Sequence, residues 1–322
     1  MSLALPEEGI GVRQKPFPSL VPIQPLGSRP PLFLMAGGGG IVYTFYKLQN
    51  LLDPGQPIYA LQDPALQPGI NPFETVEELA AYQIKTIKSV QPDGPFLLGG
   101  WSFGGTVAYE MAQQLTRERH EVPVVFLMDT HAIDAARGEP ARPLWRSVLT
   151  ALTNLAVGVG MTKDTWPYIV DGLYLLTLDV RGEVDGDSGG LAWRDRAGRA
   201  CANWMRHLLR NADVAQYVSR DSRLQTAPKG TLIRTLKVLA ANARSLRRYV
   251  PEPYPGRLVV LRANDQPLKR RFSDNPTLGW ASLARERVEV LPVGGNHVTL
   301  FSQPYVNEVA NHINKWLMKE QV

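Results

Sequence analysis

One short segment limits the fold of this chain more than any other. Residues Gly99–Gly105 read GGWSFGG, between an apolar run typical of a strand, Pro95–Gly99, and a helix predicted for Gly104–Thr116. Ser102 has glycines two positions before and after it, the pattern Gly-x-Ser-x-Gly. A serine on a tight strand-to-helix turn has strained backbone angles, and such glycines avoid clashes with it. The turn would lift the hydroxyl above a sheet, where free N–H groups of the helix N-terminus stabilise an oxyanion. We therefore predict a nucleophile rather than a structural serine.

A phosphate-binding loop is the main alternative for these glycines. Gly99 and Gly104 have the spacing of such a loop, but Gly105 stands where that motif requires lysine. A second glycine run, Gly37–Gly40, also lacks the Lys-Ser/Thr pair and does not continue as GxGxxG. We therefore expect no bound nucleotide, and we predict no metal site.

Strand-like and helix-like segments alternate on both sides of the turn. The predicted strands are short apolar runs: Pro31–Met35, Pro57–Gln62, Pro95–Gly99, Val122–Asp129, Gly256–Ala263 and Val288–Val293. The predicted helices are longer segments: Val42–Leu52, Thr75–Val90, Gly104–Thr116, Thr231–Tyr249 and Tyr305–Lys319. The run Val122–Asp129 is nearly all apolar, as a strand buried on both faces should be. The alternation predicts an α/β fold with a mostly parallel central sheet flanked by helices.

Two parts of the chain do not follow this alternation. The first residues are rich in proline and have no helical period, so residues 1–24 are predicted as an N-terminal linker. Residues 135–229 contain helical stretches but no convincing strand, which predicts a helical insertion. The core would then consist of two parts, residues 25–134 and residues 230–322.

Composition excludes several classes of protein. No apolar stretch approaches about 18 uninterrupted residues, so no membrane span is expected. The N-terminus carries acidic residues and lacks the basic flank and apolar stretch of a signal peptide. The single cysteine, Cys201, cannot form an internal disulfide, which favours a reducing, cytoplasmic location. A net charge of +5 is small for 322 residues and argues against a nucleic-acid binder.

A serine nucleophile needs a base, and one of the five histidines stands out. His297 follows the last predicted strand through a Gly-Gly-Asn loop, late in the chain. The order Ser, Asp, His along the chain of α/β-hydrolases puts the base in such a place. Two acids could orient it, because Asp129 ends the strand after the serine's helix and Asp265 follows the next-to-last predicted strand. Topology alone leaves both open.

Several segments together resemble a known family. They are GGWSFGG, PPLFLMAGGGG, LMDTHA, RRYVPEPYPGRLVVLRA and GGNHVTLF. They are similar to the type I thioesterase domains that release the finished chain from polyketide synthases and nonribosomal peptide synthetases. The similarity runs from about Leu20 to the C-terminus, except for residues 135–227. It implies an α/β-hydrolase fold in which residues 135–229 form a helical lid over a substrate channel.

The resemblance also implies roles for particular residues. In that family the triad acid follows the strand after the helix of the nucleophile, which implies Asp129, with Asp265 as the alternative. Ser102 would be the nucleophile and His297 the base. The implied oxyanion donors are backbone N–H groups, one of Phe103 and one of Gly37 or Gly38. Many family members have His-Gly or His-Pro at the start of this loop, whereas this chain has Ala-Gly.

The implied function is chain release from a carrier protein. The substrate would be an acyl or peptidyl thioester on the carrier's 4'-phosphopantetheine, and the domain itself would bind no cofactor. Hydrolysis or macrocyclisation would complete release, with the carrier upstream in the same assembly line. Basic residues in the insertion would suit an acidic carrier, although solvated arginines are the more common explanation. The alternative is a stand-alone editing thioesterase or a carboxylesterase, since both share this triad.

Overall fold

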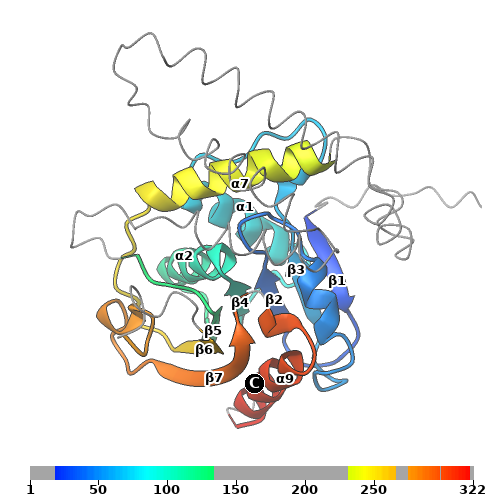
Figure 1. Cartoon of the computed structure of the whole chain (residues 1–322), viewed down its shortest axis with the longest axis vertical. Helices are drawn as coiled ribbons and strands as arrows, with labels where there is room; N and C mark the ends of the chain where they lie inside the picture. The colour runs from blue at the N-terminus through cyan, green and yellow to red at the C-terminus, as the bar shows by residue number, and fades with distance from the viewer. Residues whose placement is uncertain (1–18, 134–230, 266–274, 298, 320–322) are drawn as a thin grey trace, which may run out of the picture.

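Seven strands form one central sheet in the part of the chain that the computed structural model describes, residues 19–133, 231–265, 275–297 and 299–319 (Figure 1). The strands are β1 (Leu20–Gln24), β2 (Leu32–Met35), β3 (Ile58–Leu61), β4 (Leu97–Trp101), β5 (Val124–Met128), β6 (Leu258–Asp265) and β7 (Glu289–Asn296). Their order in the sheet is β1-β3-β2-β4-β5-β6-β7. Only the pairing of β1 with β3 is antiparallel among these strands. The predicted mostly parallel sheet is confirmed.

Helices cover both faces of the sheet. The α-helices in the described parts of the chain are α1 (Val76–Lys88), α2 (Phe103–Arg117), α7 (Thr231–Arg248) and α9 (Tyr305–Lys319). Helices α1 and α2 pack on one face, where β5 contributes Val125 and Leu127 to the core. Helix α9 packs on the other face, against Phe126 and Met128 of the same strand. All five residues of β5 are buried, which agrees with its nearly continuous apolar sequence.

One predicted helix is a shorter element of another kind. Residues Val42–Leu52 were expected to be an α-helix, but the structure has a 3₁₀ helix, η1 (Tyr43–Leu48). The segment begins with aromatic and β-branched residues, which lose side-chain freedom in an α-helix. Asn50 has φ of 64°, a left-handed conformation that ends any helix at this point. Within the described residues, three further 3₁₀ helices are η2 (Pro64–Leu66), η4 (Trp280–Ser282) and η5 (Thr299–Phe301).

The predicted linker is partly wrong, because its last residues belong to the sheet. Strand β1 lies within residues 1–24 and pairs with β3 along one edge. Proline is tolerated there because an edge strand has backbone groups that pair with no neighbour. Pro22 coincides with a register irregularity between Pro22 and Gln24. The rest of the predicted linker and the helical insertion at 135–229 lie outside the described residues.

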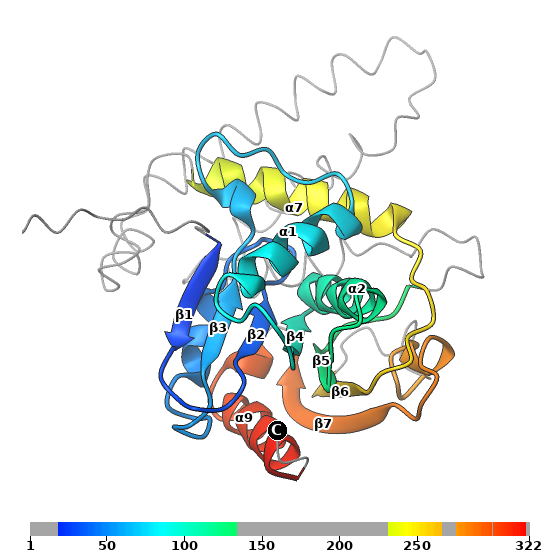
Figure 2. The ribbon, with the colours of Figure 1, turned by 180° about the vertical axis from the view of Figure 1, so that it is seen from behind.

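Helix α7 lies across the top of α1 in both views (Figures 1 and 2). It also contacts η2, where Arg234 Nε donates a hydrogen bond of 2.8 Å to the carbonyl of Leu66. The helix therefore sits above the loops that follow β2 and β3. This position brings its side chains to the carboxyl ends of those strands.

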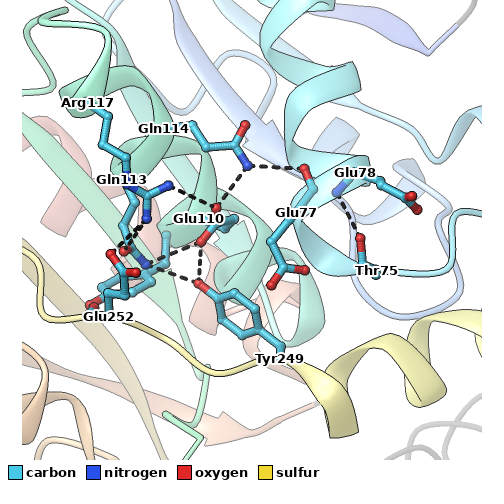
Figure 3. A network of polar contacts seen from close by, with 10 residues as sticks. Thr75, Glu77, Glu78, Glu110, Gln113, Gln114, Arg117, Tyr249 and Glu252 are labelled. Atoms are coloured by element: carbon cyan, nitrogen blue, oxygen red, sulfur yellow. Dashed lines mark hydrogen bonds and ion pairs between the residues drawn. The ribbon is translucent and has the colours of Figure 1, made fainter.

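A buried carboxylate ties α2 to the end of α7 (Figure 3). Glu110 of α2 is 3% exposed, and its Oε2 accepts a hydrogen bond of 2.7 Å from the hydroxyl of Tyr249. Its Oε1 accepts another of 2.9 Å from Gln114, and Gln113 donates to the Tyr249 hydroxyl at 3.1 Å. Arg117 lies 3.8 Å from Oε1 at the solvent edge. Burial raises the pKa of Glu110 despite these hydrogen bonds.

We predict that the Glu110→Gln variant becomes more stable, relative to the unchanged protein, as pH rises. The folded state holds the Glu110 proton to higher pH than the unfolded chain, so ionisation opposes folding above about pH 4.5. The variant has no such titration, and the difference in unfolding free energy should shift by about 1.4 kcal/mol for each unit that the folded-state pKa is raised. Urea unfolding of both proteins between about pH 4.5 and pH 8 measures this difference. A pH-independent difference would contradict the prediction.

Candidate active site

The turn at Ser102 is made possible by contacts that only glycine permits. Ser102 has φ of 57°, in the left-handed region, between the end of β4 and the start of α2. A Cβ on Gly100 would overlap the backbone of Gly104. A Cβ on Gly104 would overlap the carbonyls of Met35 and Ala36 at the end of β2. Strand, helix and neighbouring loop therefore touch backbone to backbone, and the serine is held in a strained conformation.

The backbone of Ser102 is tied to both neighbours of Asp129. Its N–H donates to the carbonyl of Met128 at 3.1 Å, at the end of β5. Its carbonyl accepts a hydrogen bond of 3.0 Å from Thr130 Oγ1. Two of the three predicted triad residues are thus anchored to each other through the main chain of adjacent parallel strands.

Asp129, which is buried, and His297, which is partly buried, form a hydrogen-bonded pair. The Nδ1–H of His297 donates to Oδ2 of Asp129 at 2.7 Å, and the two side chains are 19% and 1% exposed. The other oxygen, Oδ1, accepts a hydrogen bond of 3.1 Å from the N–H of Ala263 in β6. Asp129 itself has φ of 46°, and its N–H donates to the carbonyl of Leu261 at 2.7 Å. Main-chain contacts with β6 therefore fix the carboxylate behind the imidazole.

The electrostatics of this pair favour an ionised carboxylate at Asp129. Burial alone would raise the pKa of Asp129, but the hydrogen bond and charge of His297, the charge of His131 and the N–H of Ala263 outweigh it and lower the pKa. An ionised carboxylate can only accept hydrogen bonds. The proton between the two groups therefore belongs to Nδ1 of His297, and Nε2 is the ring nitrogen that does not contact the carboxylate.

Trp101, the residue before the serine, holds the loop of His297. Its indole Nε1–H donates to the main-chain carbonyl of His297 at 3.0 Å. The indole and imidazole rings lie 5.3 Å apart between centroids, with planes tilted by 32°. Next to His297, the N–H of Asn296 donates to Thr299 Oγ1 at 2.8 Å. The segment that carries Ser102 and the loop that carries His297 are thus in direct contact.

The two predicted sources of oxyanion donors also lie side by side. Phe103 is the first residue of α2, where N–H groups have no partner inside the helix. In the Gly-rich loop, the N–H of Gly40 donates to the carbonyl of Gly37 at 2.8 Å and closes a turn. A Cβ on Gly38 would lie 3.9 Å from Cβ of Phe103, and one on Gly37 would lie 2.9 Å from the Trp101 ring. The roles of Phe103, Gly37 and Gly38 stay predictions.

Of the two candidate acids, Asp129 is the one hydrogen-bonded to the imidazole of His297. Asp265 is exposed at the end of β6, where it is the register partner of Asn296. It lies at the same edge of the sheet, as its position after a parallel strand implies. The assignment of Ser102, Asp129 and His297 as a catalytic triad stays a prediction, now with a measured contact between the last two.

Sequence reasoning assigned no role to two residues near this pair. Trp101 lies inside the serine motif, but its contact with a carbonyl almost two hundred positions away has no local pattern. His131 lies close enough to Asp129 to lower the pKa of that carboxyl, and burial lowers the pKa of His131 itself. The sequence LMDTHA places it two positions after Asp129, which is the only signal that could have drawn attention to it.

The described residues contain neither a metal-binding cluster nor a membrane-spanning helix. Among the described residues, no three histidine, cysteine, aspartate or glutamate side chains are placed to hold a metal ion. No helix within the described ranges combines the length and apolar character needed to cross a bilayer.

Comparison with known proteins identifies relatives of this chain. Residues 30–159 match the thioesterase domain family. Chondramide synthase cmdD of Chondromyces crocatus is 28% identical over 294 residues, which are 90% of this chain and 7% of that protein. Malpibaldin synthetase of Mortierella alpina is 38% identical over 113 residues, which are 35% of this chain and 2% of that protein.

A solved structure shares the fold over most of both chains. It is the NocB thioesterase domain in covalent complex with a fluorophosphonate nocardicin G analog, with 23% identity and a TM-score of 0.57 over 92% of this chain and 99% of that chain. The present chain spans only a small part of the two synthetases it matches. It has the α/β-hydrolase fold and resembles the thioesterase domains of nonribosomal peptide synthetases and polyketide synthases.

Proposed function

We propose that this chain is a thioesterase that releases an acyl or peptidyl chain from the phosphopantetheine thioester of a carrier protein, through an acyl-serine intermediate. The observation that carries the proposal is the anchoring of strained Ser102 to the strand end that presents Asp129 to His297. The match of residues 30–159 to the thioesterase domain family supports the reaction class. The synthetase relatives support a carrier protein as the partner.

In the first half-reaction of this proposal, the three side chains act in turn. Nε2 of His297 accepts the hydroxyl proton of Ser102, whose oxygen attacks the thioester carbonyl. Ionised Asp129 stabilises the imidazolium that forms. The tetrahedral oxyanion is stabilised by the N–H of Phe103 and one N–H of the Gly-rich loop. His297 then returns its proton to the departing pantetheine thiol, which leaves the acyl group on Ser102.

The second half-reaction releases the product. Water, or a hydroxyl or amine of the acyl chain, loses its proton to His297 and attacks the acyl-serine carbonyl. The bond between the carbonyl carbon and Oγ of Ser102 then breaks, and His297 returns the proton to that oxygen. Water gives a free acid, whereas an internal nucleophile gives a macrocycle. Carrier departure must precede this step because the second nucleophile enters the space of the thiol.

Replacing Ser102 by alanine should abolish this chemistry. We expect Ser102→Ala to lower turnover of an acyl thioester by about 10⁴-fold or more, since the nucleophile is lost while the fold is kept. Steady-state kinetics with an acyl-pantetheine donor measures the loss, and thermal unfolding checks the fold. Turnover equal to that of the unchanged protein would exclude a serine mechanism.

The contact of Trp101 with the His297 loop should affect catalysis more than binding. Trp101→Phe keeps an aromatic ring but removes the N–H that holds the His297 carbonyl, so the imidazole loses part of its orientation. We expect kcat to fall by about 10-fold with little change in KM. Trp316→Phe is a matched control, because Trp316 packs edge-to-face on Phe126 beneath the sheet. Unchanged kcat in the Trp101 variant, or an equal loss in the control, would contradict this role.

Substrate comparison separates the proposal from the editing thioesterase and the carboxylesterase. The measurement is kcat/KM for long acyl chains on a carrier protein, for acetyl groups on the same carrier, and for oxygen esters of the same acyl groups. We expect the long carrier-linked thioester to be turned over fastest. Preference for acetyl would favour editing, and preference for oxygen esters would favour a carboxylesterase. The Ser102→Ala variant gives the background rate for each donor.

A further inference from the structure

The Gly-rich loop is held from above by a side chain of α7. Asn242 is 3% exposed, and its Nδ2 donates to the carbonyl of Gly38 at 3.0 Å. The same nitrogen donates to Oδ2 of Asp63 at 3.3 Å. A side-chain amide has two N–H groups, one for each acceptor. One buried amide therefore joins α7, the loop after β2 and the loop after β3.

Asp63 is itself fixed on its other side. Asp63 is 1% exposed, and its Oδ1 accepts a hydrogen bond of 2.9 Å from the N–H of Ala65. Burial raises the pKa of Asp63, while the contacts with Ala65 and Asn242 act in the opposite direction. Its main-chain N–H donates to the carbonyl of Gly40 at 3.0 Å. The carboxylate thus has a defined position from which to orient the amide.

The close approach at Gly40 shows how little room the loop has to shift. Gly40 has φ of 76°, and a Cβ there would lie 2.5 Å from Cβ of Asp63 and 3.1 Å from Cγ1 of Val238. Leu239 of α7 lies against Gly38 in the same way, with Cδ1 at 3.3 Å from the position of an added Cβ. Helix α7 therefore packs directly on the glycines.

These contacts set the orientation of two successive peptide groups. The carbonyl of Gly37 is held by the N–H of Gly40, and the carbonyl of Gly38 is held by Asn242. In a trans peptide the N–H points away from the carbonyl of the preceding residue. Fixing the Gly37 carbonyl therefore fixes the direction of the Gly38 N–H. Fixing the Gly38 carbonyl prevents rotation of the next peptide plane, which carries the N–H of Gly39.

We propose that Asn242 and Asp63 are positioning residues for the oxyanion loop: Asp63 orients the amide of Asn242, which holds the Gly38 carbonyl so that the loop presents its N–H groups beside Phe103. The inference rests on the proposed serine mechanism. It assigns no contact with substrate to either side chain. A preorganised donor contributes most when it needs no rearrangement as charge develops, and this pair supplies that rigidity.

The first test removes the amide and keeps the size of the side chain. Asn242→Leu should slow phosphonylation of Ser102 by a small fluorophosphonate about 10- to 100-fold, because the phosphoryl oxygen uses the same donors as the oxyanion. The kcat for an acyl thioester should fall in parallel, while KM changes by less than about twofold. An unchanged labelling rate would overturn the inference. So would a crystal structure of the variant in which the Gly38 peptide keeps its orientation.

A second variant separates positioning from stability. The double exchange Asp63→Asn with Asn242→Asp restores a hydrogen bond between positions 63 and 242, and the new amide oxygen can still accept from the N–H of Ala65. It provides no donor for the Gly38 carbonyl. The melting temperature should recover relative to Asn242→Asp alone, whereas the labelling rate should stay low. Recovery of both would mean that the pair acts only through stability, and would overturn the inference.

The control lies on the same helix. Ser245→Ala removes a buried hydroxyl that donates to the carbonyl of Asn242 inside α7 at 3.0 Å. Its labelling rate should equal that of the unchanged protein, and a loss as large as in Asn242→Leu would overturn a specific role for the amide.

Labelling and thioester turnover distinguish the two hypotheses. If Ser102 is labelled but thioesters are not turned over, the proposed substrate fails and the labelling rates still decide the role of Asn242. If thioesters are turned over and Asn242→Leu is labelled normally, the inference alone fails. Absence of labelling in the unchanged protein would overturn both.

Discussion

The whole site depends on backbone contacts around two glycines. Gly100 and Gly104 let the end of β4, the start of α2 and the end of β2 approach with no side chain between them. With a Cβ at either position, the helix could not start immediately after the strand. Ser102 would then lose its left-handed conformation, and the first N–H groups of α2 would move away from the Gly-rich loop. The position of Ser102 therefore depends on main-chain contacts among β4, α2 and the loop after β2.

The parallel sheet converts this local turn into a site. Trp101 pairs in register with Met128, and Asp265 pairs with Asn296, so the strands end at one edge. Loops after the parallel strands of an α/β sheet meet outside the carboxyl ends of those strands. The Gly-rich loop, Ser102, Asp129 and His297 each follow a different strand, and the register brings them together. Distance along the chain is thus no obstacle to the contact between Asp129 and His297.

Much of this arrangement was predictable because it depends on patterns in sequence. The alternation of strands and helices and the glycines around Ser102 report directly on backbone geometry. Topology could not choose between Asp129 and Asp265, since both follow parallel strands and reach the same edge. The difference is three-dimensional: Asp129 turns inward with a positive φ and is buried, whereas Asp265 is exposed. Strand β1 escaped prediction for a similar reason, because only its edge position makes Pro22 acceptable there.

Two of the residues that sequence reasoning missed have one property in common. Trp101 and Asn242 both donate to main-chain carbonyls, of His297 and Gly38 respectively. A carbonyl is present at every position, so the accepting end of such a contact leaves no trace in residue type. The donating end looks ordinary as well, because one asparagine within a helix usually faces solvent. Yet carbonyl contacts control the direction of the attached peptide N–H groups and loops, on which oxyanion stabilisation and proton transfer depend. Where a site consists mainly of main-chain groups, its geometry depends on the side chains that fix the main chain through hydrogen bonds.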